Sequence, residues 1–397
     1  MRNVQQLGNR RPSTKGPLLS NGSFTVTQKL SKLKVCQSLL VTLLGMGAVS
    51  HHAQAEDVSF EGKRVEFVMP YKEGGGTDTW GRFYAPYLSQ SLPGNPVVVV
   101  KNIPGGGSTK GANQFARRGK DNGLNIFASS ASTQYPYLLQ DRRVRYDYND
   151  WSVILASPTG GVVYVSPKVG IENVQDLFDK KDQLKFQYAS QGATSIDLVP
   201  LLAMDLLGLD VQAIFGMQGR GAGRLAFERG EVNIDSQTSS SYIDKVTPLV
   251  NEGKAIPLFS FGVLGEDGKL QRDPNFPELP HFAEVYQMFH PHQAEAQSAE
   301  TQGYAVWRSF FMAGFAAQKM IFVPKSTPEE MVAAWRESAS ELVTQPNFQQ
   351  RAVEVLGDYP QLTGEQAQLA LDAALSLDET NLEWVRNWLT TNYNTRF

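Results

Sequence analysis

A glycine-rich segment from Pro70 to Asp78 follows the mostly apolar run from Val65 to Met69. This pattern predicts a strand, a loop and the start of a helix, with Thr77 or Asp78 as the N-cap. Glycines let a backbone approach a ligand closely, and the first turn of a helix offers unpaired N–H groups at the positive end of its dipole. The segment therefore predicts a small-anion site, and by itself it does not distinguish a phosphate from a carboxylate.

The N-terminus indicates export. Residues 1–55 contain seven Lys or Arg and no Asp or Glu, then an apolar run from Val35 to Val49, then the cleavage pattern Ala53-Gln54-Ala55. These are the three regions of a secretory signal peptide. A membrane anchor is the alternative, but the run is shorter than the roughly 18 apolar residues that a span requires. We expect cleavage near Ala55 and a periplasmic protein.

Removal of residues 1–55 changes the composition. The single cysteine, Cys36, leaves with the signal, so the remaining chain has no thiol for a disulfide or a metal. It keeps 30 Lys and Arg (37 less 7) against 40 Asp and Glu, a formal charge of about −10. An acidic exported protein is a poor candidate for binding nucleic acid or anionic membranes. An anionic ligand would then depend on local backbone dipoles and a few side chains.

Signatures of catalysis are missing from the sequence. It contains no Gly-x-Ser-x-Gly elbow and no phosphate-binding loop, and the histidines after the signal lack partners at metal-site spacing. We therefore expect no enzymatic activity, no cofactor and no metal.

Strand-like and helix-like segments alternate along residues 56–397, which predicts an α/β fold with largely parallel sheets. We expect residues 56–157 to form the first part of one lobe, 158–257 a second lobe, and 258–397 to complete the first. The polar stretch 264–303 is predicted to be a loop or surface insertion. Two lobes joined by two crossings form a hinged clamshell, with the ligand between strand ends.

Two motifs resemble the substrate-binding proteins of tripartite tricarboxylate transporters, the Bug receptors. One is Pro70-Tyr71 followed by the glycines, Asp78 and Arg82, and the other is the valine-rich strand before Asn102-Ile103-Pro104-Gly105. The resemblance implies a two-lobe, type II periplasmic-binding (Venus flytrap) fold that binds a carboxylate. The chain departs from the family pattern at Thr194, Leu198 and Met217, where the family has glycine, histidine and tyrosine.

The resemblance also implies which residues contact the ligand. Backbone N–H groups of the glycine loop would face those of a hydroxyl-rich loop in the other lobe. Strand-end hydroxyls and one carboxylate complete the expected set, which is Tyr71, Gly75, Gly76, Thr77, Asp78, Ser129, Ser130, Thr133, Ser190, Gly192, Ala193, Thr194, Ser195 and Asp235. We expect Arg82 to pair with Asp78 on the helix surface. Arg220 and Arg224 are expected to be solvated, and Asn102 to brace neighbouring backbone.

The sequence therefore predicts a monomeric, extracytoplasmic solute receptor that delivers a small organic carboxylate to the permease subunits of a membrane transporter. A periplasmic sensor that signals to a membrane kinase fits the same fold. A secreted hydrolase or transferase is the alternative from another functional class.

Overall fold

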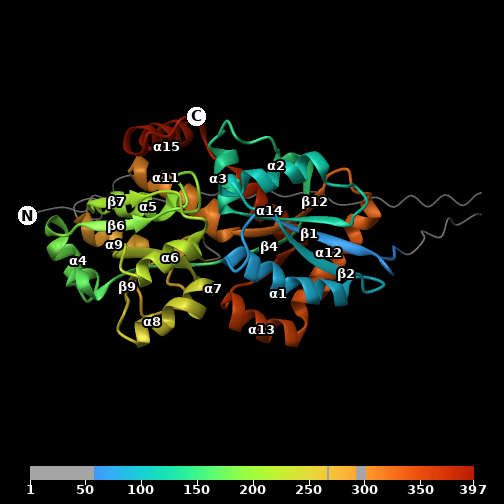
Figure 1. Ribbon diagram of the computed structural model, residues 1–397, viewed down its shortest axis with the longest axis horizontal. Coiled ribbons are helices and arrows are strands. Elements are labelled where there is room, and N and C mark those ends of the chain that lie inside the picture. Colours follow the sequence, from blue (N-terminus) through green and yellow to red (C-terminus); the bar gives the residue numbers. More distant parts are fainter. Residues whose placement is uncertain (1–57, 266–267, 292–300) are drawn as a thin grey trace, which may run out of the picture. The chain divides into compact units, whose positions relative to one another are not determined.

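Two main β-sheets organise the computed structural model, which describes residues 58–265, 268–291 and 301–397 (Figure 1). The strand order is β13-β4-β12-β3-β1-β2 in the first sheet and β7-β6-β8-β5-β9 in the second. Helices alternate with strands along most of the chain, so the predicted α/β fold is confirmed. The expectation of largely parallel sheets is wrong, because each main sheet combines parallel and antiparallel pairs. The predicted signal peptide lies outside the described residues.

The first sheet combines parallel strands with a strand from far along the chain. β1 pairs in parallel with β2 and β3, whereas β12 is inserted antiparallel between β3 and β4. Because β12 runs the other way, its first residue, Lys319, lies beside Ser130, the last residue of β3. The strands are β1 (Arg64–Met69), β2 (Val97–Asn102), β3 (Asn125–Ser130), β4 (Trp151–Ser157), β12 (Lys319–Pro324) and β13 (Leu362–Thr363).

The second sheet is built from residues 161–260. β6 is parallel to β7 and β8, and β5 is antiparallel to β8 and β9. The end of β8, at Thr238, therefore lies beside the start of β5, at Gly161. The strands are β5 (Gly161–Val165), β6 (Phe186–Ala189), β7 (Val211–Ile214), β8 (Ile234–Thr238) and β9 (Ile256–Ser260).

Helices cover both sheets. The helical elements on the side of the first sheet are α1 (Gly76–Ser91), a 3-10 turn (Gly106–Ser108) with α2 (Thr109–Arg118), α3 (Ala131–Leu138), α12 (Glu329–Thr344), α13 (Pro346–Leu356) and α14 (Gly364–Leu375). The helices on the side of the second sheet are α4 (Val174–Lys180), α5 (Leu198–Leu206), α6 (Arg220–Glu228), α7 (Ser239–Ser241), α8 (Thr247–Asn251) and α9 (Phe282–Phe289). The chain ends with α11 (Gln302–Phe311) before β12, and with α15 (Glu379–Tyr393).

Apolar spacing explains how α1 is fixed. Trp80, Tyr84 and Leu88 recur every four residues, lie on one helix face and are at most 1% exposed. They join a core cluster with Phe67 of β1 and Trp335 of α12. The start of α1 is thus held at the edge where the parallel strands of the first sheet end.

The polar stretch from residue 264 contains regular structure that its composition did not indicate. A short hairpin joins β10 (Val263–Leu264) to β11 (Leu270–Gln271), and α9 follows. Phe282 of α9 is fully buried and contacts Trp307 of α11. The expectation of a loop is therefore wrong for α9, because a few apolar residues at helical spacing decide the structure of a mostly polar segment.

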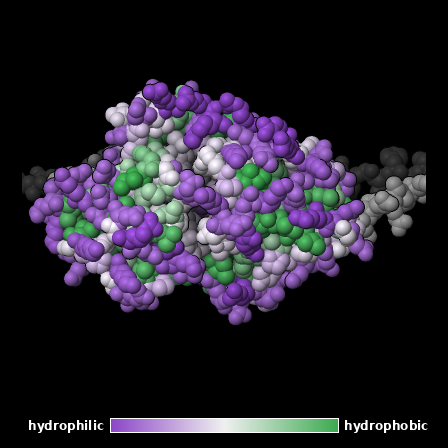
Figure 2. Space-filling model, in the orientation of Figure 1, coloured by the Kyte–Doolittle hydropathy of each residue, from purple (hydrophilic) through white to green (hydrophobic). Residues whose placement is uncertain are grey.

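The surface in view is mostly hydrophilic, as expected when the large apolar side chains are buried in the core. Figure 2 shows hydrophilic residues over most of the face in view, with hydrophobic residues in small separate groups. Within the part of the chain that the structure describes, the helices all lack the length and apolar character that a membrane crossing requires.

Candidate functional site

A cavity of about 620 Å³ lies where loops from both sheets meet. Residues 70–77 and 104–108 line it from the first sheet, together with the neighbouring β3–β12 edge. Residues 216–222 and Thr238 line it from the second sheet. The cavity thus lies at strand ends, where open α/β sheets bind their ligands.

The N-terminus of α1 is open toward this cavity. The N-cap is Gly75, in extended backbone, and not Thr77 or Asp78 as the sequence predicted. A glycine carries no side-chain acceptor, so the N–H groups of the first turn are left for another partner. Gly75, Gly76 and Thr77 line the cavity. They present these donors at the positive end of the helix dipole.

Asp78 faces the loop behind it, which explains why it is not the N-cap. Its carboxylate accepts from the Gly74 N–H at 2.9 Å, from Arg82 Nε at 2.9 Å and from Asn102 Nδ2 at 2.8 Å. Burial raises the pKa of Asp78, but these donors outweigh it and hold the pKa below its usual value. The same Asn102 amide donates to the Tyr71 carbonyl at 3.0 Å. The predicted Arg82–Asp78 ion pair and the bracing role of Asn102 are confirmed.

A chain of hydroxyl groups fixes Tyr71 at the cavity wall. The Tyr71 hydroxyl is 2.6 Å from Ser130 Oγ and 2.7 Å from Thr133 Oγ1. Tyr71 and Ser130 line the cavity, whereas Thr133 is fully buried behind them. Ser129 is also buried, with its Oγ 2.5 Å from the Tyr148 hydroxyl. Burial raises the pKa of Tyr71, so its hydroxyl stays protonated at neutral pH.

The second glycine loop also borders the cavity. Pro104 to Ser108 line it, and Ser108 has a φ of 101°, which is unusual for a residue with a side chain. Its Oγ donates to the Ser132 carbonyl at 2.9 Å. This bond holds the strained backbone in place beside the α3 N-terminus.

The hydroxyl-rich loop after β6 is organised around the fully buried Asp197. That carboxylate accepts from Ser190 Oγ at 2.9 Å and from the Gln191 N–H at 2.7 Å, and Ser195 Oγ donates to the Gly192 carbonyl at 2.7 Å. Gln191 and Ile196 line the cavity. The residues predicted here are not among the lining residues, namely Ser190, Gly192, Ala193, Thr194 and Ser195.

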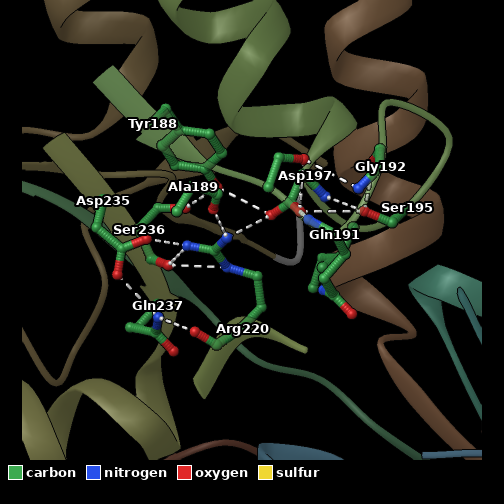
Figure 3. Close-up of polar contacts among 12 residues, drawn as sticks. Tyr188, Ala189, Gln191, Gly192, Ser195, Asp197, Arg220, Asp235, Ser236 and Gln237 are labelled. Carbon is green, nitrogen blue, oxygen red and sulfur yellow. Dashed lines mark hydrogen bonds and ion pairs between the residues drawn. The ribbon is translucent and has the colours of Figure 1, made fainter. Parts of the chain in front are cut away.

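Arg220, at the start of α6, lies between Asp197 and Asp235 (Figure 3). It also donates to the Ala189 carbonyl at 2.6 Å and to the Ser236 carbonyl at 2.8 Å. The prediction of a solvated Arg220 is therefore wrong, since its side chain is only 12% exposed. The same expectation is wrong for Arg224, whose side chain is 16% exposed, lines the cavity and pairs with Glu228. Burial lowers the pKa of Arg220, but the two carboxylates outweigh burial and hold this pKa above its usual value.

Asp235 was predicted to accept from a ligand, and the structure places it elsewhere. It is fully buried behind Arg220, which pairs with its Oδ1. Its Oδ2 accepts from the Tyr164 hydroxyl at 2.5 Å and from Gln237 Nε2 at 2.9 Å. Both carboxylate oxygens are thus engaged inside the second sheet.

Lys319 is a cavity residue that sequence reasoning missed. It is 4% exposed and lines the cavity, and its ammonium group makes no hydrogen bond or ion pair with any residue that the structure describes. Burial lowers the pKa of its ammonium group to about 7. The one sequence signal is a Lys directly before the apolar run Met320 to Val323, which indicates a charged residue at the end of a buried strand.

The arrangement suits a small anion better than a metal. Three helices of eight or more residues begin at the cavity, with Gly75, Ser130 and Gly219 as their N-caps. The two glycines have no side-chain acceptor, and Ser130 Oγ is bonded to Tyr71. Among the described residues, no group of three or more His, Cys, Asp or Glu is placed to hold a metal ion.

Comparisons with known proteins agree with the fold. No family model matches the chain. A curated protein from Pseudomonas sp., described as "UPF0065 protein in tcbD-tcbE intergenic region", is 24% identical over 338 residues, covering 81% of this chain and 87% of that protein.

Three solved structures are also similar. The periplasmic binding protein BugD has a TM-score of 0.62 at 21% identity, covering 83% of this chain and 97% of its own. A Rhodopseudomonas palustris protein with adipate has a TM-score of 0.61 at 16% identity, covering 83% and 97%. MatC from the same organism, with bound malate, has a TM-score of 0.55 at 17% identity, covering 78% and 99%. The chain thus has the fold of periplasmic solute-binding proteins and, as its motifs indicated, resembles the Bug receptors of tripartite tricarboxylate transporters.

Proposed function

We propose that the protein is an extracytoplasmic receptor that captures a small organic carboxylate and delivers it to a tripartite tricarboxylate-type membrane transporter. The observation that carries this proposal is the convergence of three helix N-termini on one cavity, each without a side-chain acceptor of its own to satisfy its first turn. Such N–H groups bind anions through the positive end of the helix dipole.

A carboxylate is favoured over other anions by the solved structures that share the fold, since one is described with malate and another with adipate. In this chain we assign ligand contact to the predicted residues that line the cavity, namely Tyr71, Gly75, Gly76, Thr77 and Ser130. The other predicted residues, apart from Ala193, form hydrogen bonds within the protein, and we propose that they position the lining ones.

The two sheets supply the two halves of the proposed clamshell. The α1 N-terminus lies close to the second sheet, because a Cβ added at Gly76 would be 3.0 Å from Ser241 Oγ of α7. We propose that the lobes rotate about the two chain crossings and enclose the carboxylate. The protein would then release the ligand intact at the permease, without catalysis, in the compartment to which the signal peptide directs it.

The proposal is tested by thermal unfolding of the exported protein with malate, adipate, citrate, benzoate, glucose and glutamine. A ligand at about 100 times its dissociation constant raises the free energy of unfolding by about 2.7 kcal/mol. We expect at least one carboxylate to raise the unfolding temperature and to be recovered unchanged. Stabilisation by glucose alone, or conversion of the bound carboxylate, would contradict the proposal.

A further inference from the structure

Lys319 is a buried charged group of the cavity to which the described residues offer no counter-charge. The other buried cation at the cavity, Arg220, is paired with Asp197 and Asp235. Lys319 is as deeply placed, and the described residues give it no acceptor. Lysine is almost never fully buried unless it is paired, because burial removes the water that solvates its ammonium group.

The neighbours of Lys319 on the sheet are neutral. Its partners across the strands are Ser130 on β3 and Ser157 on β4. The preceding residue, Gln318, also lines the cavity, and its Oε1 has no hydrogen-bond partner in the described chain. This edge of the first sheet therefore carries unused polar groups where a ligand can reach.

The other titratable and charged groups around the cavity do not neutralise Lys319. Arg143 pairs with Asp141, and Arg224 pairs with Glu228. The carboxylate among the lining residues, Glu73, lies with Lys72 on the exposed part of the glycine loop and is 3.7 Å from Arg82. The hydroxyl of Tyr71 is bonded to serine and threonine. The described residues therefore leave a charged Lys319 without a counter-charge, which an anionic ligand can supply.

We propose that Lys319 pairs directly with a carboxylate of the ligand and that the protein takes up a proton when this ligand binds. The inference rests on the proposed function and assigns the side-chain charge that recognises the anion. The helix N-termini donate N–H groups to the carboxylate, and the ammonium group of Lys319 supplies the full positive charge.

Protonation follows from the burial of Lys319. Burial lowers the pKa of the free residue to about 7, and a bound carboxylate raises it again because it stabilises the ammonium form. At a pH between the pKa of Lys319 in the free protein and its pKa in the complex, Lys319 is neutral without ligand and charged with ligand bound. Affinity therefore falls as the pH rises above about 7, by up to about tenfold per pH unit.

The test is titration calorimetry with malate, adipate, citrate and benzoate at pH 8.5, in two buffers of different ionisation enthalpy. The difference in heat between the buffers counts the protons bound with the ligand. We expect the wild type to take up close to one proton. Lys319→Met should weaken binding roughly 10- to 100-fold and lose the uptake. Lys319→Arg should bind without uptake, because arginine stays charged at this pH.

Lys325→Met is the matched control. Lys325 directly follows the other end of β12 and is exposed, so its loss removes the same charge without reaching the cavity. It should change the affinity less than about twofold. Unfolding curves of every variant establish that each is folded.

The outcomes separate the two proposals. A wild type that binds a carboxylate without proton uptake overturns this inference and leaves the proposed function standing, and this result needs no variant. Unchanged affinity in Lys319→Met also overturns it. A wild type that binds none of the four carboxylates overturns both.

Discussion

Arg220 and Lys319 are both buried cations at one cavity, and they differ in every other respect. Arg220 belongs to the second sheet's side, where two carboxylates and two backbone carbonyls accept from it. Lys319 belongs to the first sheet, where the described residues offer it no acceptor. The difference indicates that the Arg220 charge is used to hold the protein together, while the Lys319 charge is available to a ligand.

The side chains suit these two tasks. A guanidinium has five donors in a fixed plane and remains charged when buried, so it can join several acceptors permanently. An ammonium on a flexible stem changes its protonation when its surroundings change. The charge of Arg220 on one wall of the cavity is therefore constant, whereas the charge of Lys319 on the other wall changes when a ligand binds.

Removal of Arg220 is expected to have the largest effect. Arg220→Met leaves Asp197 and Asp235 buried without their cation, and breaking a buried pair in this way costs about 3–5 kcal/mol. Denaturant unfolding should show this loss for Arg220→Met and no comparable loss for Lys319→Met. Similar stability losses in both variants would remove the distinction between the two cations.

A charge at the α1 N-terminus should act on binding and not on folding. Gly75→Asp places a carboxylate where the ligand's carboxylate is expected, so affinity should fall at least about 100-fold, or about 2.7 kcal/mol. The backbone of Gly75 is extended (φ −83°), and aspartate is a favourable N-cap, so stability should change by less than about 0.5 kcal/mol.

Gly75→Asn is the control for that variant, because it caps the helix without adding charge. It should retain more affinity than Gly75→Asp. Equal losses in the two variants would mean that side-chain volume, and not charge, decides binding at this helix end.

The ligand-free protein should reveal Lys319 through the pH dependence of its stability. Between about pH 7 and pH 10.5 the folded chain holds Lys319 neutral, while the unfolded chain keeps it protonated. The unfolded state then binds more protons, so the free energy of unfolding rises with pH. Relative to Lys319→Met, the rise should approach about 1.4 kcal/mol per pH unit. Parallel profiles for the two proteins would contradict a depressed pKa.

Local patterns made much of the fold predictable. The strand from Val65 to Met69, the glycine loop and the following helix are set by neighbouring residues, and they appear as β1, the cavity loop and α1. The Arg82–Asp78 pair is likewise one helix turn long. Contacts between residues that are close in the sequence could therefore be predicted from the sequence alone.

Contacts between distant segments explain the failures. Thr77 or Asp78 was expected to cap α1, but Asn102 draws the Asp78 carboxylate toward β2. Arg220 was expected in solvent and Asp235 at the ligand, and the two are joined because α6 begins beside β8. Lys319 was overlooked because β12 is inserted beside β3, 189 positions away along the chain from Ser130. The hydrophobic periodicity of the sequence does not indicate which distant segments pair.

We infer that the ammonium group of Lys319 pairs with a ligand carboxylate, and the titration of Lys319 itself is the decisive measurement. Lysine labelled with ¹³C at Cε gives an NMR signal for each lysine, and the signal missing from Lys319→Met identifies the residue. Without ligand, we expect that signal to titrate near pH 7. With the carboxylate that stabilises the protein present in excess, the titration should move above pH 9. An unchanged titration midpoint with the carboxylate bound would rule out this pairing.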